Sequence, residues 1–229
     1  MENPSNDKAL TIAQRRLDVI GRMEAAAKRA GFGVSADLVA VSKMQPDSRV
    51  KDMLGAGQKI FGENRVQEAQ KRWGDKFKTA RADIELRLIG PLQSNKAQDA
   101  VELFDVIETL DREKLAKALV KAAEKTGRLP RLYVQVNMGE EPQKSGVTPQ
   151  ELPEFLKRLS SEYGLHPEGL MCIPPIGEAA SPHFWLLSKL AAQNGLEKLS
   201  MGMSGDYEVA IEMGATSVRV GSALFGARG

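Results

Sequence analysis

Apolar residues recur at three- and four-residue steps near the amino end of the chain, at Ala13, Leu17, Ile20, Met23 and Ala27. This spacing puts them on one face of an amphipathic helix, which we expect over residues 10–30 and which the glycine at position 31 should end. Beyond this point the pattern changes to short aliphatic or β-branched runs separated by longer helical patterns.

The short runs predict strands at residues 38–42, 59–61, 85–89, 105–107, 132–136, 166–173, 198–200 and 217–220. The patterns between them predict helices at 47–56, 65–73, 95–103, 112–125, 149–161, 182–193 and 205–213. Strands that alternate with helices form parallel sheets with right-handed crossovers. Eight such strands predict a closed (β/α)8 TIM barrel preceded by an N-terminal helix. An open doubly wound sheet is the alternative, because two of the predicted strands are very short.

Composition places this α/β fold in one domain over residues 1–229, with residues 1–7 disordered, since no linker or change of composition divides the chain. The net charge is +2, and no basic block marks a nucleic-acid arm. The polar start MENPSNDKAL carries no export signal, and no apolar run reaches the length of a membrane span. We therefore expect a cytoplasmic monomer that binds neither nucleic acid nor membrane.

The single cysteine, Cys172, has no partner for an internal disulfide and lies in an apolar run, where core packing is its expected role. One cysteine and two histidines do not make a structural zinc site, so no metal is expected.

Polar and glycine-containing segments cluster where the predicted strands end, which is the face that carries chemistry in such barrels. Lys43 directly follows the first predicted strand. It is either a solvated loop charge or a Schiff-base lysine, whose amine, of ordinary pKa ~10.4, must be tuned down before it attacks an aldehyde.

The last two predicted strands end in segments that suit a phosphate. Ser204 stands where the N-cap of the following helix is expected, so that its hydroxyl and the next amides would face an anion. Gly221 permits close backbone approach and Ser222 offers a hydroxyl donor. The alternative is that both glycine-containing segments are simply turns.

Two asparagines carry a structural and a functional interpretation. Asn64, with Gln67, either caps the predicted helix at 65–73 or reaches a ligand hydroxyl. Asn95 is expected to cap the helix at 95–103, while Lys96 is either solvated or a second cation near the mouth of the barrel.

Together these stretches resemble the pyridoxal phosphate homeostasis proteins (YggS/PROSC type), which are relatives of the alanine racemase N-terminal barrel. The resemblance spans about residues 10 to 226 and rests on seven segments in family order: 40–43, 61–64, 89–96, 134–137, 169–171, 199–204 and 218–221. Two departures stand out. Arg87 replaces a usual histidine and Arg65 a usual tyrosine, and both put contacts at the mouth or partner surfaces in question, but not the cofactor lysine.

The resemblance implies that Lys43 carries pyridoxal 5'-phosphate, that Ser204, Gly221 and Ser222 hold its phosphate, and that Asn64 lies near the ring. It also implies that Arg219 lies by the pyridine nitrogen, where a cation would disfavour protonation and weaken the ring as an electron sink.

The implied function is storage, buffering or delivery of the cofactor without an established reaction, with no catalytic residue. Free amino acids or apo-enzymes that require the cofactor are the implied partners. A single-domain racemase or decarboxylase is one alternative. A cofactor-free aldolase acting through Lys43 on a phosphorylated sugar is another.

Overall fold

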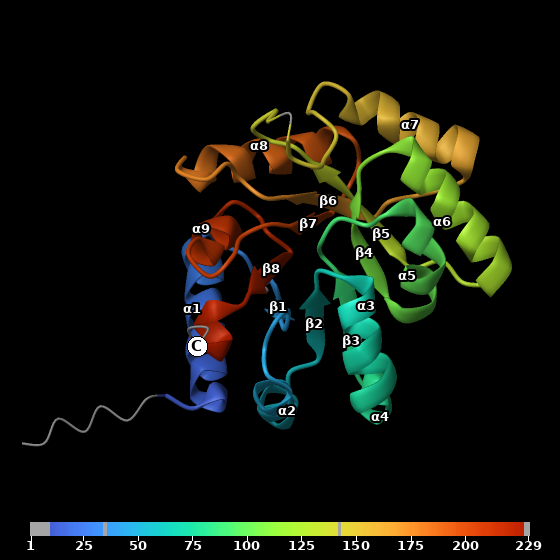
Figure 1. Cartoon of the computed structure of the whole chain (residues 1–229). Coiled ribbons are helices and arrows are strands. Elements are labelled where there is room, and N and C mark those ends of the chain that lie inside the picture. The colour runs from blue at the N-terminus through green and yellow to red at the C-terminus, as the bar shows by residue number, and fades with distance from the viewer. Residues whose placement is uncertain (1–9, 34–35, 142, 227–229) are drawn as a thin grey trace, which may run out of the picture.

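The computed structural model describes residues 10–33, 36–141 and 143–226, and in these residues eight strands close into a barrel in the order β1 to β8 (Figure 1). Every neighbouring pair is parallel, including β1 with β8. The strands are β1 (Asp37–Val41), β2 (Ile60–Glu63), β3 (Glu85–Leu88), β4 (Val106–Leu110), β5 (Arg131–Val136), β6 (Gly169–Cys172), β7 (Lys198–Ser200) and β8 (Ser217–Val220). The predicted (β/α)8 barrel is confirmed and the open sheet is wrong. The predicted disorder of residues 1–7 lies outside the described residues.

Helices surround the barrel. They are α1 (Ile12–Arg29), α2 (Asp47–Gly55), α3 (Val66–Ala69), α4 (Lys78–Arg81), α5 (Ala97–Leu103), α6 (Glu113–Thr126), α7 (Leu152–Tyr163), α8 (Ala180–Gln193), α9 (Tyr207–Glu212) and α10 (Ser222–Phe225), with a π-helix η1 (Gln70–Lys76) and a 3-10 turn η2 (Ser94–Lys96). Across the described residues, none of these helices is long and apolar enough to cross a membrane.

The predicted N-terminal helix is confirmed as α1, which packs beside α9 and α10. Its start is fixed by a capping box: the Thr11 hydroxyl accepts from the Gln14 amide, and the Gln14 side chain accepts from the Thr11 amide. Val19, Met23 and Ala26 lie on its buried face. The apolar face of α1 thus packs on the outside of the closed barrel, together with α9 and α10.

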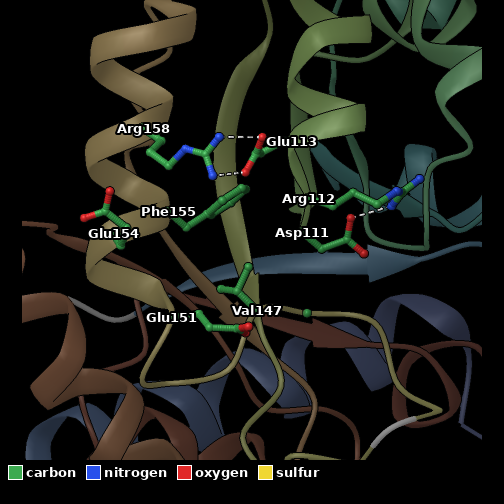
Figure 2. Close-up of a pocket in the computed structure, with 9 residues that line it drawn as sticks. Asp111, Arg112, Glu113, Val147, Glu151, Glu154, Phe155 and Arg158 are labelled. Atoms are coloured by element: carbon green, nitrogen blue, oxygen red, sulfur yellow. Dashed lines mark hydrogen bonds and ion pairs between the residues drawn. The ribbon is translucent and has the colours of Figure 1, made fainter.

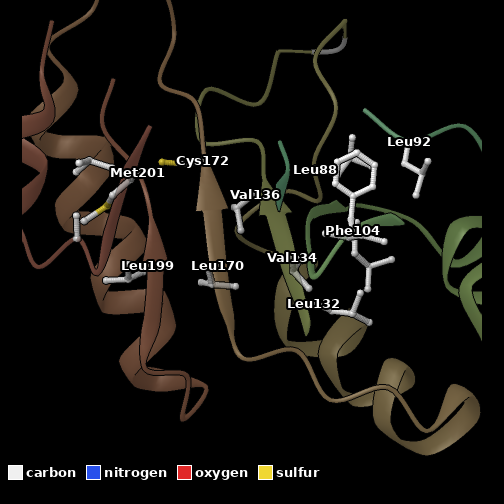
Figure 3. Close-up of a cluster of buried hydrophobic side chains, with 14 of the residues drawn as sticks. Leu88, Leu92, Phe104, Leu132, Val134, Val136, Leu170, Cys172, Leu199 and Met201 are labelled. Carbon is white, nitrogen blue, oxygen red and sulfur yellow. The ribbon is translucent and has the colours of Figure 1, made fainter. Parts of the chain in front are cut away.

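The core lies mainly between the strands and the helices that cover them. The strands are buried almost throughout, as expected for a parallel barrel covered on its outer face. Figure 3 shows part of this cluster, which joins residues of the barrel strands to neighbouring loops: Leu88, Leu92, Phe104, Leu132, Val134, Val136, Leu170, Cys172, Leu199 and Met201.

Two predicted helices are built differently from a plain α-helix. The segment predicted at 65–73 is a short α3 that continues into the π-helix η1 and is followed by α4. The segment predicted at 95–103 opens with the 3-10 turn η2, and Asn95 lies inside that turn instead of capping the helix. Lys96 occupies the N-cap position of α5.

Candidate functional site

The lysine predicted to form a Schiff base stands at the carboxyl end of β1. Lys43 is half-buried and opens a two-residue turn with Met44. The φ angle of Met44 is 56°, in the left-handed region that residues other than glycine rarely adopt, and the residue is 70% exposed. Because Met44 gains little from burial, its neighbours must hold this turn in shape.

Asn64 occupies the corresponding position on the next strand. β1 and β2 pair Val41 with Gly62, so Lys43 and Asn64 each stand two residues beyond the same pair. The side-chain oxygen Oδ1 of Asn64 is buried and has no hydrogen-bond partner among the described residues. The N-cap of α3 is Arg65, without a side-chain cap, so the capping role predicted for Asn64 is wrong. An unpaired buried acceptor beside Lys43 suits a hydroxyl donor of a ligand.

The close approach of a second loop fixes Asn64. A side chain at Gly90, after β3, would place its Cβ 2.4 Å from the carbonyl oxygen of Asn64. Only glycine lets the two backbones meet at this distance. The glycine of the third strand end therefore positions the asparagine of the second.

Ser204 and the start of α10 meet at the ends of β7 and β8. The Ser204 hydroxyl oxygen accepts hydrogen bonds from the backbone amides of Gly221 at 3.1 Å and Ala223 at 3.4 Å. Its predicted role as N-cap of the following helix is wrong, because α9 begins at Tyr207 with Asp206 at the N-cap. The hydroxyl and the two amides nevertheless converge, and the exposed Ser222 lies between those amides in the chain.

Packing within the chain does not account for the glycine at position 221. Its φ is −115°, and an added Cβ would lie 3.6 Å from the Cβ of Val41, which is ordinary contact. Space next to this backbone therefore fits the close approach of a ligand, here a phosphate between loop amides.

Arg219 points into the barrel. It is 4% exposed, and it donates from Nη1 to the Ser200 hydroxyl at 2.7 Å and from Nη2 to the Cys172 carbonyl at 2.7 Å. Cys172 is buried, and burial raises the pKa of its thiol to about 12. Its predicted role in the core is confirmed, since such a thiol is a poor nucleophile.

Of the two departures from the family pattern, Arg65 lies at the mouth and Arg87 does not. Arg87 is buried and reaches Asp37 at 3.0 Å and Glu85 at 2.5 Å, the first residues of β1 and β3. The question that the sequence raised about contacts at the mouth therefore concerns Arg65 and not Arg87. Burial opposes its charge, but Glu108 and Glu85 outweigh burial and raise its pKa.

A hollow of about 760 Å³ adjoins Asn64. Three cationic side chains, Arg65, Lys96 and Arg112, are among the described residues that line it, and no carboxylate is. Each cation has an acidic neighbour outside that lining, namely Glu68, Asp99 and Asp111. Lys96 is thus a cation of the mouth, as one of its two interpretations predicted.

A second hollow, of about 380 Å³, lies between α6 and α7 (Figure 2). Arg158 of α7 bridges to Glu113 of α6 across it, with Nη2 and Oε2 2.8 Å apart. Four carboxylates and two arginines are among the residues that line this hollow: Asp111, Arg112, Glu113, Gly146, Val147, Glu151, Glu154, Phe155 and Arg158. None of the six predicted site residues is among them.

Sequence reasoning missed one polar group beneath the Lys43 turn. Glu63, the last residue of β2, is fully buried. Its Oε1 accepts hydrogen bonds from the Ser42 hydroxyl, the Arg72 guanidinium and the Trp73 indole. In the sequence, Arg72 belongs to a polar stretch that resembles a solvated helix face, so no local pattern indicated this contact.

Comparison with known proteins gives a family model and full-length relatives. The model of the alanine racemase N-terminal domain matches residues 22–229. The chain is 41% identical over 226 residues to the pyridoxal phosphate homeostasis protein of Pseudomonas aeruginosa, covering 95% of this chain and 96% of that protein. It is 38% identical over 234 residues to the protein of the same name from Escherichia coli, covering 97% of both chains.

Solved structures resemble the fold over the same length. PipY of Synechococcus elongatus, solved with pyridoxal phosphate bound, is 36% identical with a TM-score of 0.80, covering 94% of this chain and 100% of that chain. Without the cofactor the same protein gives a TM-score of 0.83. Alanine racemase of Corynebacterium glutamicum, 19% identical with a TM-score of 0.64, covers 95% of this chain and 61% of that chain and shares the barrel fold.

Proposed function

Because the chain belongs to the pyridoxal phosphate homeostasis protein family, we propose that it binds pyridoxal 5'-phosphate as a Schiff base on Lys43. Its function is to store, buffer or deliver this cofactor. The observation that carries the proposal is the arrangement of three neighbouring strand ends. Lys43 and Asn64 stand at matching positions after β1 and β2. On the other side of β1, Gly221 directly follows β8 and lies next to Val41, the last residue of β1.

Lys43 supplies the covalent attachment. Its neutral amine adds to the aldehyde carbon of the cofactor and a water molecule leaves, so the amine must first lose the proton it carries near neutral pH. Asn64, with its unpaired buried oxygen, accepts a hydrogen bond from a hydroxyl of the ring. The cofactor supplies an aldehyde that exchanges between amines.

The phosphate is held where β7 and β8 end. The Ser204 and Ser222 hydroxyls supply donors, and the amides of Gly221 and Ala223, which donate to the Ser204 hydroxyl oxygen in the ligand-free structure, would turn to the anion when it binds. The absent side chain at Gly221 leaves room for the anion. Charge-assisted hydrogen bonds of this kind are stronger than those between neutral groups. The arrangement therefore favours the phosphorylated vitamer.

Arg219 would lie by the pyridine nitrogen of the bound cofactor and limit its chemistry. A fixed guanidinium disfavours a proton on this nitrogen and makes the ring a weaker electron sink. Its contacts with Ser200 and the Cys172 carbonyl hold the guanidinium inside the barrel. We therefore assign no catalytic residue. The racemase or decarboxylase alternative needs the carbanion chemistry that this arrangement weakens.

Amines that take up the aldehyde are the partners that fit. The hollow beside Asn64 carries Arg65, Lys96 and Arg112, which suit the carboxylate of a free amino acid or an acidic surface of an apo-enzyme. We further propose that the protein is a single domain over residues 1–229 and acts as a monomer in the cytoplasm, without binding nucleic acid or membrane.

The first prediction concerns the covalent bond. Wild-type protein mixed with pyridoxal 5'-phosphate should show a visible band and, after borohydride reduction, an adduct mass on the peptide that contains Lys43. Lys43→Ala should lose both, because no amine remains at the end of β1. Absorption spectroscopy and peptide mass spectrometry measure the two effects. Lys96→Ala is the matched control and should keep both.

An adduct on Lys96 or Lys144 would contradict the assignment. The same preparations separate the carrier from a racemase: L- and D-alanine in deuterated water should not exchange their α-protons at an enzyme-like rate. Sustained exchange with interconversion of the two enantiomers, both lost in Lys43→Ala, would establish the racemase alternative instead. An aldolase would bind no cofactor and stay colourless.

A further inference from the structure

Arg72 contacts both sides of the turn that carries Lys43. Its Nη1 donates to the carbonyl oxygen of Ser42 and its Nη2 to that of Gln45, each at 2.6 Å. These two carbonyls flank Lys43 and Met44. Because Met44 holds a left-handed φ of 56°, the turn needs such an external tie to keep its shape.

The guanidinium of Arg72 is itself fixed in place. Its Nη1 also donates to Glu63 Oε1 at 2.8 Å, and the same oxygen accepts from the Ser42 hydroxyl at 2.8 Å and the Trp73 indole at 3.2 Å. The side chain of Glu63 is 0% exposed and that of Arg72 only 13%. A buried, charge-assisted network of this kind has little freedom to rearrange.

Local backbone geometry brings these donors together. Arg72 and Trp73 are consecutive residues of the π-helix η1, and the Phe77 amide closes its ring on the Arg72 carbonyl at 2.8 Å. π-helical turns are rare and occur frequently at functional sites. Here the turn directs two neighbouring side chains toward one carboxylate oxygen below Lys43.

We propose that Arg72 is a positioning residue: by tying the carbonyls of Ser42 and Gln45 it fixes where the Lys43 amine stands relative to the cofactor aldehyde. This inference rests on the proposed function. Arg72 touches neither amine nor cofactor in this role; it acts through the backbone. Covalent capture of the aldehyde therefore depends on Arg72 more than non-covalent binding does.

A purely structural role, in which Arg72 only neutralises the buried Glu63, makes a different prediction. Loss of the ion pair would then lower stability and weaken every mode of ligand binding together. The separation of capture from binding is thus the decisive measurement. It requires a probe without an aldehyde, and 4'-deoxypyridoxine 5'-phosphate keeps the ring and phosphate while lacking that group.

Two variants keep the test informative. Arg72→Lys retains the charge beside Glu63 but lacks the fork that reaches two carbonyls at once. The double variant Arg72→Met with Glu63→Gln removes both charges and so leaves no unpaired carboxylate. Arg81→Lys is the matched control, since Arg81 likewise ties the carbonyls of Leu103 at 2.6 Å and Ile84 at 3.1 Å, but near the amino end of β3.

We expect the rate of borohydride-trappable capture to fall about tenfold or more in the double variant and by a smaller factor in Arg72→Lys, since small misplacements of a reacting group cost large factors in rate. Affinity for the deoxy probe should change by about twofold at most, because Ser204, Gly221 and Ser222, which are proposed to hold the phosphate, are unchanged. Arg81→Lys should alter neither quantity. Wild-type capture rates in both Arg72 variants, or a parallel loss of probe affinity, would overturn the proposal.

Hydrogen exchange of the ligand-free protein tests the same tie without any cofactor. The amides of residues 43–45 should exchange faster in both Arg72 variants than in wild type or Arg81→Lys. Unchanged exchange in this segment would also overturn the proposal. A wild-type adduct on a lysine other than Lys43 would instead overturn the proposed function, and the exchange comparison would still decide whether Arg72 orders the turn.

Discussion

At the scale of single residues, the hydroxyl of Ser204 is the side-chain group that draws the β7 and β8 loops together. It accepts from the amides of Gly221 and Ala223, the donors proposed for phosphate. Ser204→Ala should weaken binding of pyridoxal 5'-phosphate by about 1.5–3 kcal/mol, the usual cost of losing a hydrogen bond to a charged group. Isothermal titration against pyridoxal, which lacks the phosphate, measures the difference.

Pyridoxal should bind wild type much more weakly and lose little further in Ser204→Ala. Ser160→Ala, an exposed serine on α7, is the matched control and should bind both vitamers like wild type. Equal affinity of wild type for the two vitamers would show that Ser204, Gly221 and Ser222 do not bind the phosphate.

Residues whose position in the chain sets their position in the barrel could be predicted from the sequence. Lys43 and Asn64 follow strands and therefore reach the mouth. Arg72 could not be found in this way, because its partners lie 27 and 30 residues away and meet it only when the barrel closes. The surroundings of Arg87 could not be predicted either, because a strand residue points toward the barrel interior or away from it according to neighbours that the sequence does not reveal.

At the scale of elements, periodicity identified every barrel strand, and β3, β7 and β8 begin at the predicted residues. It could not separate α3 from the π-helix η1, because α- and π-helical turns bury similar spacings of apolar residues. The four-residue helices α4 and α10 were also missed, since one turn is too short to show a period. The hydrophobic pattern thus predicts whether a long segment is a helix or a strand, while π-helical turns and one-turn helices depend on how the segment packs in the folded protein.

Ion pairs join α1 to α9 through Glu208 and Glu212, so the stability of this contact depends on pH. Glu208 of α9 pairs with Arg22 at Nε, 2.9 Å, and with Arg29 at 3.3 Å, and the hydrogen bond from Arg22 lowers its pKa. A lowered folded-state pKa contributes stability above the unfolded value, near 4.3, that is lost as pH falls through the folded value. Urea unfolding of wild type and Glu208→Gln should therefore differ at pH 7, and the difference should shrink as pH falls below the unfolded value and through the folded one.

The difference at pH 7 should amount to a few-fold in the folding equilibrium constant and shrink in high salt, as for other exposed ion pairs. Glu24→Gln, an exposed acid on the same α1, is the control and should follow wild type at every pH. A gap between wild type and Glu208→Gln that does not shrink as pH falls below the unfolded value would show that the carboxylate charge is not its source.

At the scale of the whole molecule, a buried polar chain crosses the barrel interior from one face toward the other. Arg219 of β8 donates to Ser200 of β7, whose hydroxyl donates to Glu108 of β4 at 2.5 Å, and Glu108 accepts from Arg87 of β3 at 3.3 Å. Glu108 is fully buried. The proposed site at the mouth is thereby connected to the ion cluster that Asp37 and Glu85 form with Arg87.

This interior chain predicts a specific effect on stability. Glu108→Gln removes the carboxylate that faces both Ser200 and Arg87. Because Asp37 and Glu85 still pair with Arg87, the expected cost is that of weakened buried hydrogen bonds to a charged group, about 1–3 kcal/mol. Asp37→Asn removes a carboxylate from the same Arg87, but Asp37 is 57% exposed and the cost should stay below about 1 kcal/mol.

Replacing Arg87 and Glu108 together by methionine should recover most of the loss, because neither charge is then left unpaired. Urea unfolding midpoints with constant m-values compare the three proteins. Equal, small losses in Glu108→Gln and Asp37→Asn would mean that water reaches Glu108 and that the chain is not buried as described.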